Sequence, residues 1–338
     1  MHIHFKDLFL GLAIGDAYGA GLEFQDRNWI RQEVDFTRFV NKRAEIKTDK
    51  PELFTLDYNP WDYTDDAEMT VAVAKAMMSG KPFTESLLID SFTEEYNLTF
   101  SKRGYKRNGH GAMRWYFSGE KTIEEIKSFQ KDKRYPGNAP PMRAIPLGFA
   151  PSDQINEMAA INADCTHPHP LAATASILVA RATEGFLLRG IQPESIISYC
   201  ITFIDEPETI ALLKAADKLP APDSLAETDY EILCGPQPIR EDQFLPGICG
   251  LPSNAMQTAV CVLYVLKHAQ TPFEALKYSV NIGGDVDSLA SICTGLLSGK
   301  HGIGDIPSYM IENVEGRAYL AEVAEQFEVY VANVNPLK

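Results

Sequence analysis

The chain reads Asn281-Ile282-Gly283-Gly284-Asp285-Val286-Asp287-Ser288-Leu289-Ala290 near its C-terminal end. Two carboxylates and a hydroxyl fall within four residues, after two glycines that allow a tight turn with exposed backbone amides. In an extended segment, Asp285 and Asp287 would project from the same side and could reach one point in space. Residues 288–297 are rich in Ala, Leu, Ile and Thr, so we expect a helix to start just after the acidic cluster. Taken alone, the pattern is equally that of a helix cap or a solvated loop.

A second acidic cluster opens a helix that we predict between Thr64 and Gly80. Thr64 is a good N-cap, Asp65 and Asp66 lie in the first turn, and Gly80 closes the helix. Acidic residues at a helix N-terminus interact favourably with the helix dipole, so capping alone would account for this cluster. The two clusters have the same composition, however, because each gathers carboxylates and a hydroxyl at the start of an apolar helix.

The N-terminal segment predicts a helix over residues 5–24, where apolar residues recur with helical period. Gly11, Gly15 and Gly19 repeat every four residues and line one side of it. Each glycine costs roughly 1 kcal/mol relative to alanine, so the stripe indicates close approach by another helix or a ligand. Asp16 interrupts the apolar run, and both a paired or capping role and a functional role are open for it.

The rest of the chain alternates helical segments with loops, which predicts an all-α fold in one compact domain over residues 1–338. Capping boxes begin at Thr122 and at Thr271, the latter with Pro272 in the first helical position. Residues 25–60 and 219–253 are expected to be loops. Long helical patterns cover roughly 170–189, 193–203, 206–218, 254–269, 272–280 and 316–332.

The composition is that of a globular protein with a substantial core, since 45% of its 338 residues are hydrophobic and 23% are charged. No run of eighteen apolar residues occurs and the N-terminus lacks signal-peptide features, so we expect a cytoplasmic protein without a membrane span. A net charge of −15 argues against nucleic acid held through phosphates. Six scattered cysteines without metal-ligand spacing are expected to be buried, reduced thiols.

Taken together, the two acidic clusters predict a metal site. Four carboxylates brought together in a poorly solvated place repel one another strongly, and divalent cations remove that cost. All the ligands are oxygen atoms, which selects hard ions such as Mg²⁺ or Mn²⁺ over Zn²⁺. Two such ions could polarise a hydroxyl or phosphate oxygen and orient a water molecule.

The chain resembles the ADP-ribosylglycohydrolase family, which includes dinitrogenase reductase-activating glycohydrolase and the ADP-ribosylarginine and ADP-ribosylserine hydrolases. The resemblance runs nearly end to end through five motifs in the family's order. These are Gly11-Leu12-Ala13-Ile14-Gly15-Asp16-Ala17-Tyr18-Gly19-Ala20-Gly21-Leu22-Glu23, Thr64-Asp65-Asp66, Gly137-Asn138-Ala139-Pro140-Pro141-Met142-Arg143, Thr166-His167-Pro168-His169-Pro170 and Gly283-Gly284-Asp285-Val286-Asp287-Ser288.

The resemblance implies an orthogonal helical bundle with a dinuclear metal site in a central cleft and an ADP-ribose conjugate as substrate. It implies that Glu23 is the catalytic carboxylate beside the scissile bond. The implied ligands of two Mg²⁺ ions (or Mn²⁺) are Thr64, Asp65, Asp66, Asp285, Asp287 and Ser288. The implied substrate contacts are Asn138, Met142, Arg143 and His167, although Arg143 could equally be a structural clamp and His167 a surface-turn residue.

The sequence departs from the family pattern in several places. Ala67 follows Thr64-Asp65-Asp66 where threonine is usual, and Ser288 replaces a threonine but still supplies an oxygen. Residues 139–141 contain two prolines, which have no N–H to offer a phosphate. His169 stands where an acidic residue or asparagine is common, and residues 108–114 lack an aspartate that some members carry.

The leading interpretation is a hydrolase of N- or O-glycosidic bonds at C1″ of an ADP-ribosyl group. A second is a catalytically silent ADP-ribose-binding or structural protein of this fold, like the family's lens-crystallin members. A third is a two-metal phosphoester hydrolase, for which no phosphatase motif is present. The sequence leaves open the modified partner, whose recognition we expect in the loops 25–60 and 219–253, and the oligomeric state.

Overall fold

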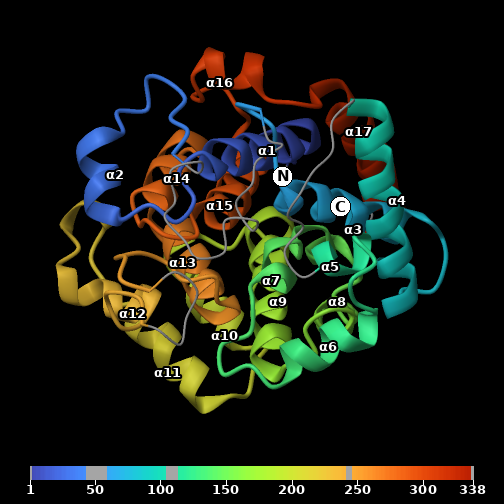
Figure 1. The fold of residues 1–338 in the computed structure, drawn as a ribbon, viewed down its shortest axis with the longest axis horizontal. Coiled ribbons are helices and arrows are strands. Elements are labelled where there is room, and N and C mark those ends of the chain that lie inside the picture. The colour runs from blue at the N-terminus through green and yellow to red at the C-terminus, as the bar shows by residue number, and fades with distance from the viewer. Residues whose placement is uncertain (1, 43–58, 104–112, 241–245, 336–338) are drawn as a thin grey trace.

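The computed structural model describes residues 2–42, 59–103, 113–240 and 246–335. Within these ranges the fold is all-α, as predicted, and Figure 1 shows its helices packed around α1 and α15. The first group of helices comprises α1 (Phe5–Ala20), α2 (Arg27–Glu33), α3 (Asp65–Met78), α4 (Glu85–Arg103), α5 (Arg114–Phe117), α6 (Ile123–Lys131), α7 (Ala139–Met142), α8 (Ile155–Asp164) and α9 (Pro170–Thr183). The second comprises α10 (Ile196–Ile201), α11 (Pro207–Ala216), α12 (Tyr230–Cys234), α13 (Ala255–His268), α14 (Pro272–Val280), α15 (Val286–His301), α16 (Ser308–Asn313) and α17 (Arg317–Val334).

The predicted helix starts are confirmed by their caps. The Thr64 side chain accepts from Asp66 N at the start of α3, and Thr122 forms the full capping box of α6. At α14, Thr271 accepts from Glu274 N as expected. The carboxylate of Glu274 reaches back to Gln270 N rather than to Thr271 N, so this second box is displaced by one residue.

The glycine stripe of α1 lies directly against α15. A Cβ added at Gly15 would lie 2.2 Å from the carbonyl oxygen of Ala290, and one at Gly19 would lie 2.5 Å from Cα of Asp287. A Cβ at Gly11 would lie 2.2 Å from Oγ of Ser298. Because these positions have no side chain, the two helix backbones can pack in contact. The acidic residues of α1 and α15 therefore lie close together.

The turn at Gly283 and Gly284 ties two distant segments to the start of α15. Both glycines have φ in the left-handed region, at 74° and 78°, where a residue with a Cβ is strained. Gly284 accepts from Phe24 N at 2.7 Å and donates to Gln25 O at 2.9 Å. Asp285 N donates to Leu251 O at 2.8 Å. The turn thus holds the chain beyond α1, and the segment before α13, beside the acidic cluster.

Two local expectations differ from the structure. Helix α15 begins at Val286, so Asp287 and Ser288 lie in its first turn and Asp285 precedes it as the N-cap residue. Asp285 and Asp287 therefore do not share an extended segment, and a helical turn rather than strand-like alternation brings them together. The sequence does not predict α4 or α8, in which polar residues interrupt the apolar ones. It also does not predict the short helices α2 and α12, which lie within the expected loops 25–60 and 219–253.

The helix over residues 170–188 is long and apolar enough to cross a membrane, by length and composition only. About 72% of its most apolar window is buried inside the protein, as in the core helix of a globular fold. The cysteines are free thiols as predicted; all are buried except Cys249, which is partly exposed.

We predict that Gly15→Ala lowers the free energy of unfolding by about 1–3 kcal/mol or more, because overpacking forces backbones apart. The matched control is Gly304→Ala, since a Cβ there has nothing within 4 Å. Urea denaturation of both variants measures the difference. Equal stability of the two variants would show that the α1–α15 contact can relax without cost.

Candidate functional site

Two groups of buried carboxylates meet where α1, α3 and α15 converge. One group contains Asp16, Asp66 and Asp287, and the other contains Glu23, Asp285 and Asp287. In each group, one carboxylate oxygen per residue lies within 4.8 Å of the others. Asp287 belongs to both groups, so its carboxylate lies between two positions that could each hold a cation.

Asp16 attaches α1 to the start of α3. Its carboxylate accepts from Thr64 N at 2.9 and 3.0 Å, from the Thr64 hydroxyl at 2.8 Å, and from Ala67 N at 2.8 Å. These amides belong to the first turn of α3, where backbone N–H groups have no partner within the helix. Asp16 therefore caps α3 from another helix and fixes the position of Asp66.

Hydroxyl and amide groups complete the cluster. The Thr64 hydroxyl lies 3.2 Å from Asp66 Oδ2 as well as bonding Asp16. Asn138 Nδ2 donates to Ser288 Oγ at 3.1 Å and to Asp285 Oδ2 at 3.3 Å. Ser288 thus faces the carboxylates, and the Asn138 amide supports both residues from the loop before α7.

The carboxyl groups are electrostatically strained. Burial, and then the charge of Asp287, raises the pKa of Asp16 to about 8. The same two causes, in the same order, raise the pKa values of Asp66 and Asp285 well above the usual range. Charged carboxylates at this density are costly in a poorly solvated interior. Protons or cations must offset that cost.

The donor set fits a hard divalent cation. Asp66 Oδ1 is buried and has no hydrogen-bond partner among the described residues, although buried polar atoms normally have one. The other ligand atoms are carboxylate and hydroxyl oxygens, which suit Mg²⁺ and Mn²⁺. No nitrogen or sulfur ligand belongs to the groups found in the described part of the chain.

Glu23 is held at the cluster by the residue that follows it. Phe24 has φ of 59°, an uncommon conformation for a bulky side chain, and its N–H is fixed on Gly284 O. The Glu23 side chain is 9% exposed and reaches the group formed with Asp285 and Asp287. Its carboxylate is therefore both near the cation positions and at the edge of the buried cluster.

Of the four aspartates predicted to bind metal, Asp65 alone lies outside both carboxylate groups. It is the first residue of α3 and is partly exposed. Its charge raises the pKa of Asp66, after the larger effects of burial, Asp287 and Asp16. The structure therefore places Asp65 beside the site, whereas it brings the carboxylate of Asp66 into it.

Arg143 is fully buried, and its guanidinium forms hydrogen bonds with other residues of the protein. Nε donates to Asn162 Oδ1 and Nη2 to Thr166 Oγ1, both at 2.8 Å. The guanidinium also stacks on Phe92, with 4.5 Å from Cζ to the ring centroid. This geometry favours the structural clamp over direct contact with substrate. Met142 is likewise buried, and its carbonyl accepts from Thr70 Oγ1 at 3.3 Å.

The two histidines of the Thr-His element have different surroundings. His167 is 2% exposed, its Nδ1 lies 2.9 Å from Thr166 Oγ1, and a Cβ at Gly137 would lie 2.9 Å from its Nε2. Burial, and then the charge of Arg143, lowers the pKa of His167 well below its usual value, so the ring is neutral at pH 7. His169 caps α9 by accepting from Leu171 N at 3.1 Å.

Sequence reasoning missed some of the groups that build the site. The sequence leaves the role of Asp16 open, although its place beside Gly15 in a helix that must pack closely is a sign that it could reach another helix. Ser253, which donates to Asn138 Oδ1 at 3.0 Å, and Thr258, whose Oγ1 lies 3.3 Å from Asn138 Nδ2, gave no sequence signal. Residues 108–112, where the missing aspartate was noted, lie outside the described residues.

Comparison with known proteins gives a consistent match over the whole chain. The family model for ADP-ribosylglycohydrolase matches residues 4–335. ADP-ribosylhydrolase ARH3 of Bos taurus is 23% identical, covering 92% of this chain and 88% of that protein. ADP-ribosyl-[dinitrogen reductase] glycohydrolase of Rhodospirillum rubrum is 23% identical, covering 96% and 94%. A solved ADP-ribosylglycohydrolase-related protein complex superposes with a TM-score of 0.61 at 19% identity, covering 97% of each chain, which supports the fold.

We predict that the stabilisation given by Mg²⁺ grows with pH. The raised pKa values of Asp16, Asp66 and Asp285 mean that the native cation-free protein binds more protons than the unfolded chain. Its stability therefore falls as pH rises towards those values. A cation must displace the same protons, so it competes better at higher pH.

The measurement is the rise in melting temperature on adding Mg²⁺, recorded from about pH 6 to about pH 8.5. Asp66→Asn should reduce this rise, whereas Asp153→Asn, at an exposed position, should leave it unchanged. A rise that is independent of pH, or that shrinks as pH increases, would contradict the role given to these carboxyl groups.

Proposed function

The chain belongs to the ADP-ribosylglycohydrolase family, and on that premise we propose that it hydrolyses the glycosidic bond at C1″ of an ADP-ribosyl group in a reaction that depends on two divalent cations. The observation that carries the proposal is the pair of carboxylate groups that share Asp287. If these carboxylates only capped helices, there would be no reason for Asp287 to belong to both groups. Nor would there be a reason for one buried oxygen of Asp66 to lack a hydrogen-bond partner among the described residues.

The cation ligands in this proposal are Thr64, Asp66, Asp285, Asp287 and Ser288, with Asp65 contributing from beside the two carboxylate groups. Bound Mg²⁺ or Mn²⁺ would polarise the hydroxyls of the distal ribose and hold its anomeric carbon in position for attack. Asp16 lies near enough to serve as a further ligand, but its four contacts to the first turn of α3 make it chiefly a positioning residue.

Glu23 is the proposed catalytic carboxylate. A carboxylate at this place takes a proton from the attacking water or a ribose hydroxyl, or accepts a hydrogen bond from the leaving group. The fixed backbone that follows Glu23 supports this role, since Phe24 and Gln25 are both bonded to Gly284. Glu23 is thereby kept within reach of the same point as Asp285 and Asp287.

The proposed substrate side lies along α7 and the turn before α9. Asn138 is hydrogen-bonded to Asp285 and Ser288, so a ligand that contacts it would lie close to the cation ligands. His167 faces Gly137 in the loop that precedes Asn138. Met142 contributes a buried wall, and Arg143 acts through Thr166, which bonds both Arg143 and His167.

The proposed substrate is an ADP-ribosylated protein or a small ADP-ribose conjugate. The names of the two similar hydrolases identify ADP-ribosyl linkages as what those proteins act on. The net charge of −15 leaves cations and backbone amides as the groups that offset the substrate's diphosphate. We also propose, on composition alone, a cytoplasmic location.

A silent ADP-ribose-binding protein is the second candidate, favoured by one feature. Residues 139–142 form α7 with Pro140 and Pro141 buried in it, so this segment offers fewer amides to a phosphate than a glycine loop would. The intact pair of carboxylate groups argues for the hydrolase instead.

The activity test uses ADP-ribosyl-arginine, ADP-ribosyl-serine and O-acetyl-ADP-ribose as substrates, each with Mg²⁺, Mn²⁺ or EDTA. We expect ADP-ribose release from at least one substrate, abolished by EDTA. Glu23→Gln should lower turnover by roughly 10²–10⁴-fold while cation and ADP-ribose binding persist. Asp287→Asn should lose cation binding and turnover together, whereas Asp153→Asn should match the unmodified protein.

Release from none of these substrates with either metal would reject the hydrolase, and tight ADP-ribose binding without turnover would support the silent protein instead. If Glu23→Gln stays fully active, its catalytic role is wrong. If it loses cation binding as well as turnover, Glu23 is a ligand of the ions rather than the base.

A further inference from the structure

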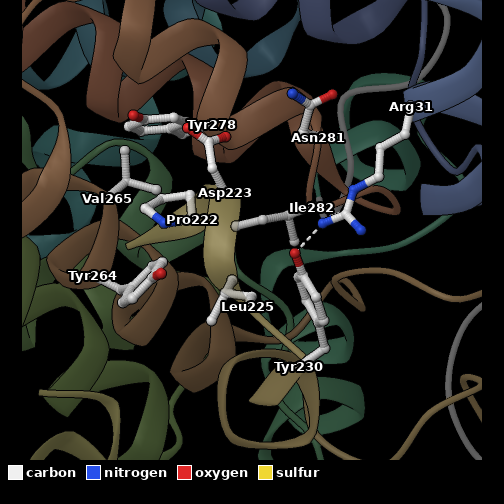
Figure 2. Close-up of a pocket in the computed structure, with 10 residues that line it drawn as sticks. All are labelled: Arg31, Pro222, Asp223, Leu225, Tyr230, Tyr264, Val265, Tyr278, Asn281 and Ile282. Atoms are coloured by element: carbon white, nitrogen blue, oxygen red, sulfur yellow. Dashed lines mark hydrogen bonds between the residues drawn. The ribbon is translucent and has the colours of Figure 1, made fainter. Parts of the chain in front are cut away.

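A cavity lies beside the glycine turn, outside the two carboxylate groups. It has a volume of about 250 Å³ and is walled by α2, the segment 222–230, α13 and the end of α14 (Figure 2). Ligand pockets for drug-sized molecules measure roughly 300–1,000 Å³, so this cavity suits a smaller occupant. Ile282 forms part of its wall and none of the carboxylates of the metal site do.

One end of the cavity is cationic; we define it by Arg31, Tyr230 and Asn281 (Figure 2). The Arg31 guanidinium donates to the Tyr230 hydroxyl. Behind Tyr230, Arg27 stacks on its ring with 3.7 Å from Cζ to the centroid. Both arginines share one carboxylate, that of Glu227, which is 64% exposed and lies 2.7 Å from Arg27 Nη2 and 3.8 Å from Arg31 Nη1. Two guanidinium groups therefore form ion pairs with a single, largely exposed carboxylate.

Arg27 places a second positive charge, buried in the protein, behind the ring of Tyr230. Its side chain has no exposed surface, and its Nε and Nη1 have no hydrogen-bond partner in the described part of the chain. A buried guanidinium normally has its donors satisfied. With only Nη2 bonded to a carboxylate, Arg27 leaves an incompletely neutralised charge next to Tyr230, which favours a negative group on the cavity side of that ring.

The opposite end is acidic; we define it by Asp223 and Tyr278, which Figure 2 shows on the other side of Ile282 from Arg31. Asp223 lies near enough to Tyr278 that its charge, after burial, raises the pKa of the phenol. A carboxylate beside an aromatic ring suits a cationic group, which the ring attracts electrostatically. The lining also includes the apolar side chains of Ile282, Leu225 and Val265, and Figure 2 shows Ile282 between Arg31 and Asp223.

We propose that this cavity binds a small dipolar molecule of the amino-acid class, with its carboxylate at the cationic end and a cationic side chain at the acidic end. Charge-assisted hydrogen bonds from guanidinium to carboxylate fix such a ligand strongly, and the apolar wall between the two ends covers its methylene groups. A purely anionic ligand would meet Asp223, and a purely cationic one would meet Arg31. The separation of the two charges therefore selects a ligand that carries both.

The test measures binding of L-lysine to the purified full chain by calorimetry and by ligand-observed NMR, with cadaverine and L-norleucine as matched probes. Cadaverine lacks the carboxylate, and L-norleucine lacks the side-chain cation. We expect saturable binding of L-lysine at millimolar or lower concentration, and binding at least about tenfold weaker for each of the other two. No activity is measured, so the outcome is independent of the hydrolase reaction.

Arg31→Gln and Asp223→Asn each remove one end of the dipole, and each should weaken L-lysine binding by about tenfold. The matched controls Lys214→Gln and Glu231→Gln alter exposed charges that do not line the cavity, and should bind as the unmodified protein does. Absence of saturable L-lysine binding would overturn the proposal. So would equal binding of all three probes, or binding that neither cavity variant weakens.

Discussion

The close contact between α1 and α15 is the constraint on which the site depends. Gly15 and Gly19 allow the two backbones to meet, and Gly19 lies against Cα of Asp287 itself. The same helix carries Asp16, which faces α3 and holds its first turn. Helix α1 therefore contacts α15 through its glycines and α3 through Asp16, and so brings together acidic residues that are far apart in the sequence.

That arrangement concentrates negative charge in the protein interior. Burial and the neighbouring Asp287 raise the pKa values of Asp16, Asp66 and Asp285, so the protein folds around groups that resist ionisation. Capping by the helix N-termini relieves only part of this cost, since one oxygen of Asp66 stays without a partner among the described residues. The cluster could therefore hold a cation, which would offset the repulsion between its carboxylates.

Much of the fold could be predicted from the sequence, because caps, glycines and apolar period are local features. Thr64, Thr122 and Thr271 mark helix starts that the structure confirms. The two acidic clusters were also recognised as one site. The start of α15 was placed too late, because Val286 and Asp287 give no local sign of helix and the turn at Gly284 sets where the helix begins.

The remainder depends on tertiary contacts that a sequence does not display. In the sequence Asp16 is an isolated carboxylate, and only the packing of α3 against α1 gives it hydrogen-bond partners. The structural role of Arg143 depends on its hydrogen bonds to Asn162 and Thr166. The cavity beside the glycine turn is likewise lined by both Arg31 and Asp223, which lie on segments without any shared motif. Side chains that act between elements are therefore the ones that local patterns miss.

The central claim is that Asp287 lies between two cation positions. Titrating the metal-free chain with Mn²⁺ and recording electron paramagnetic resonance spectra tests it most directly. We predict two Mn²⁺ ions per chain with the spectrum of a magnetically coupled pair, and loss of the coupling in Asp287→Asn. A single bound ion, or two ions with the spectra of isolated Mn²⁺, would contradict the account.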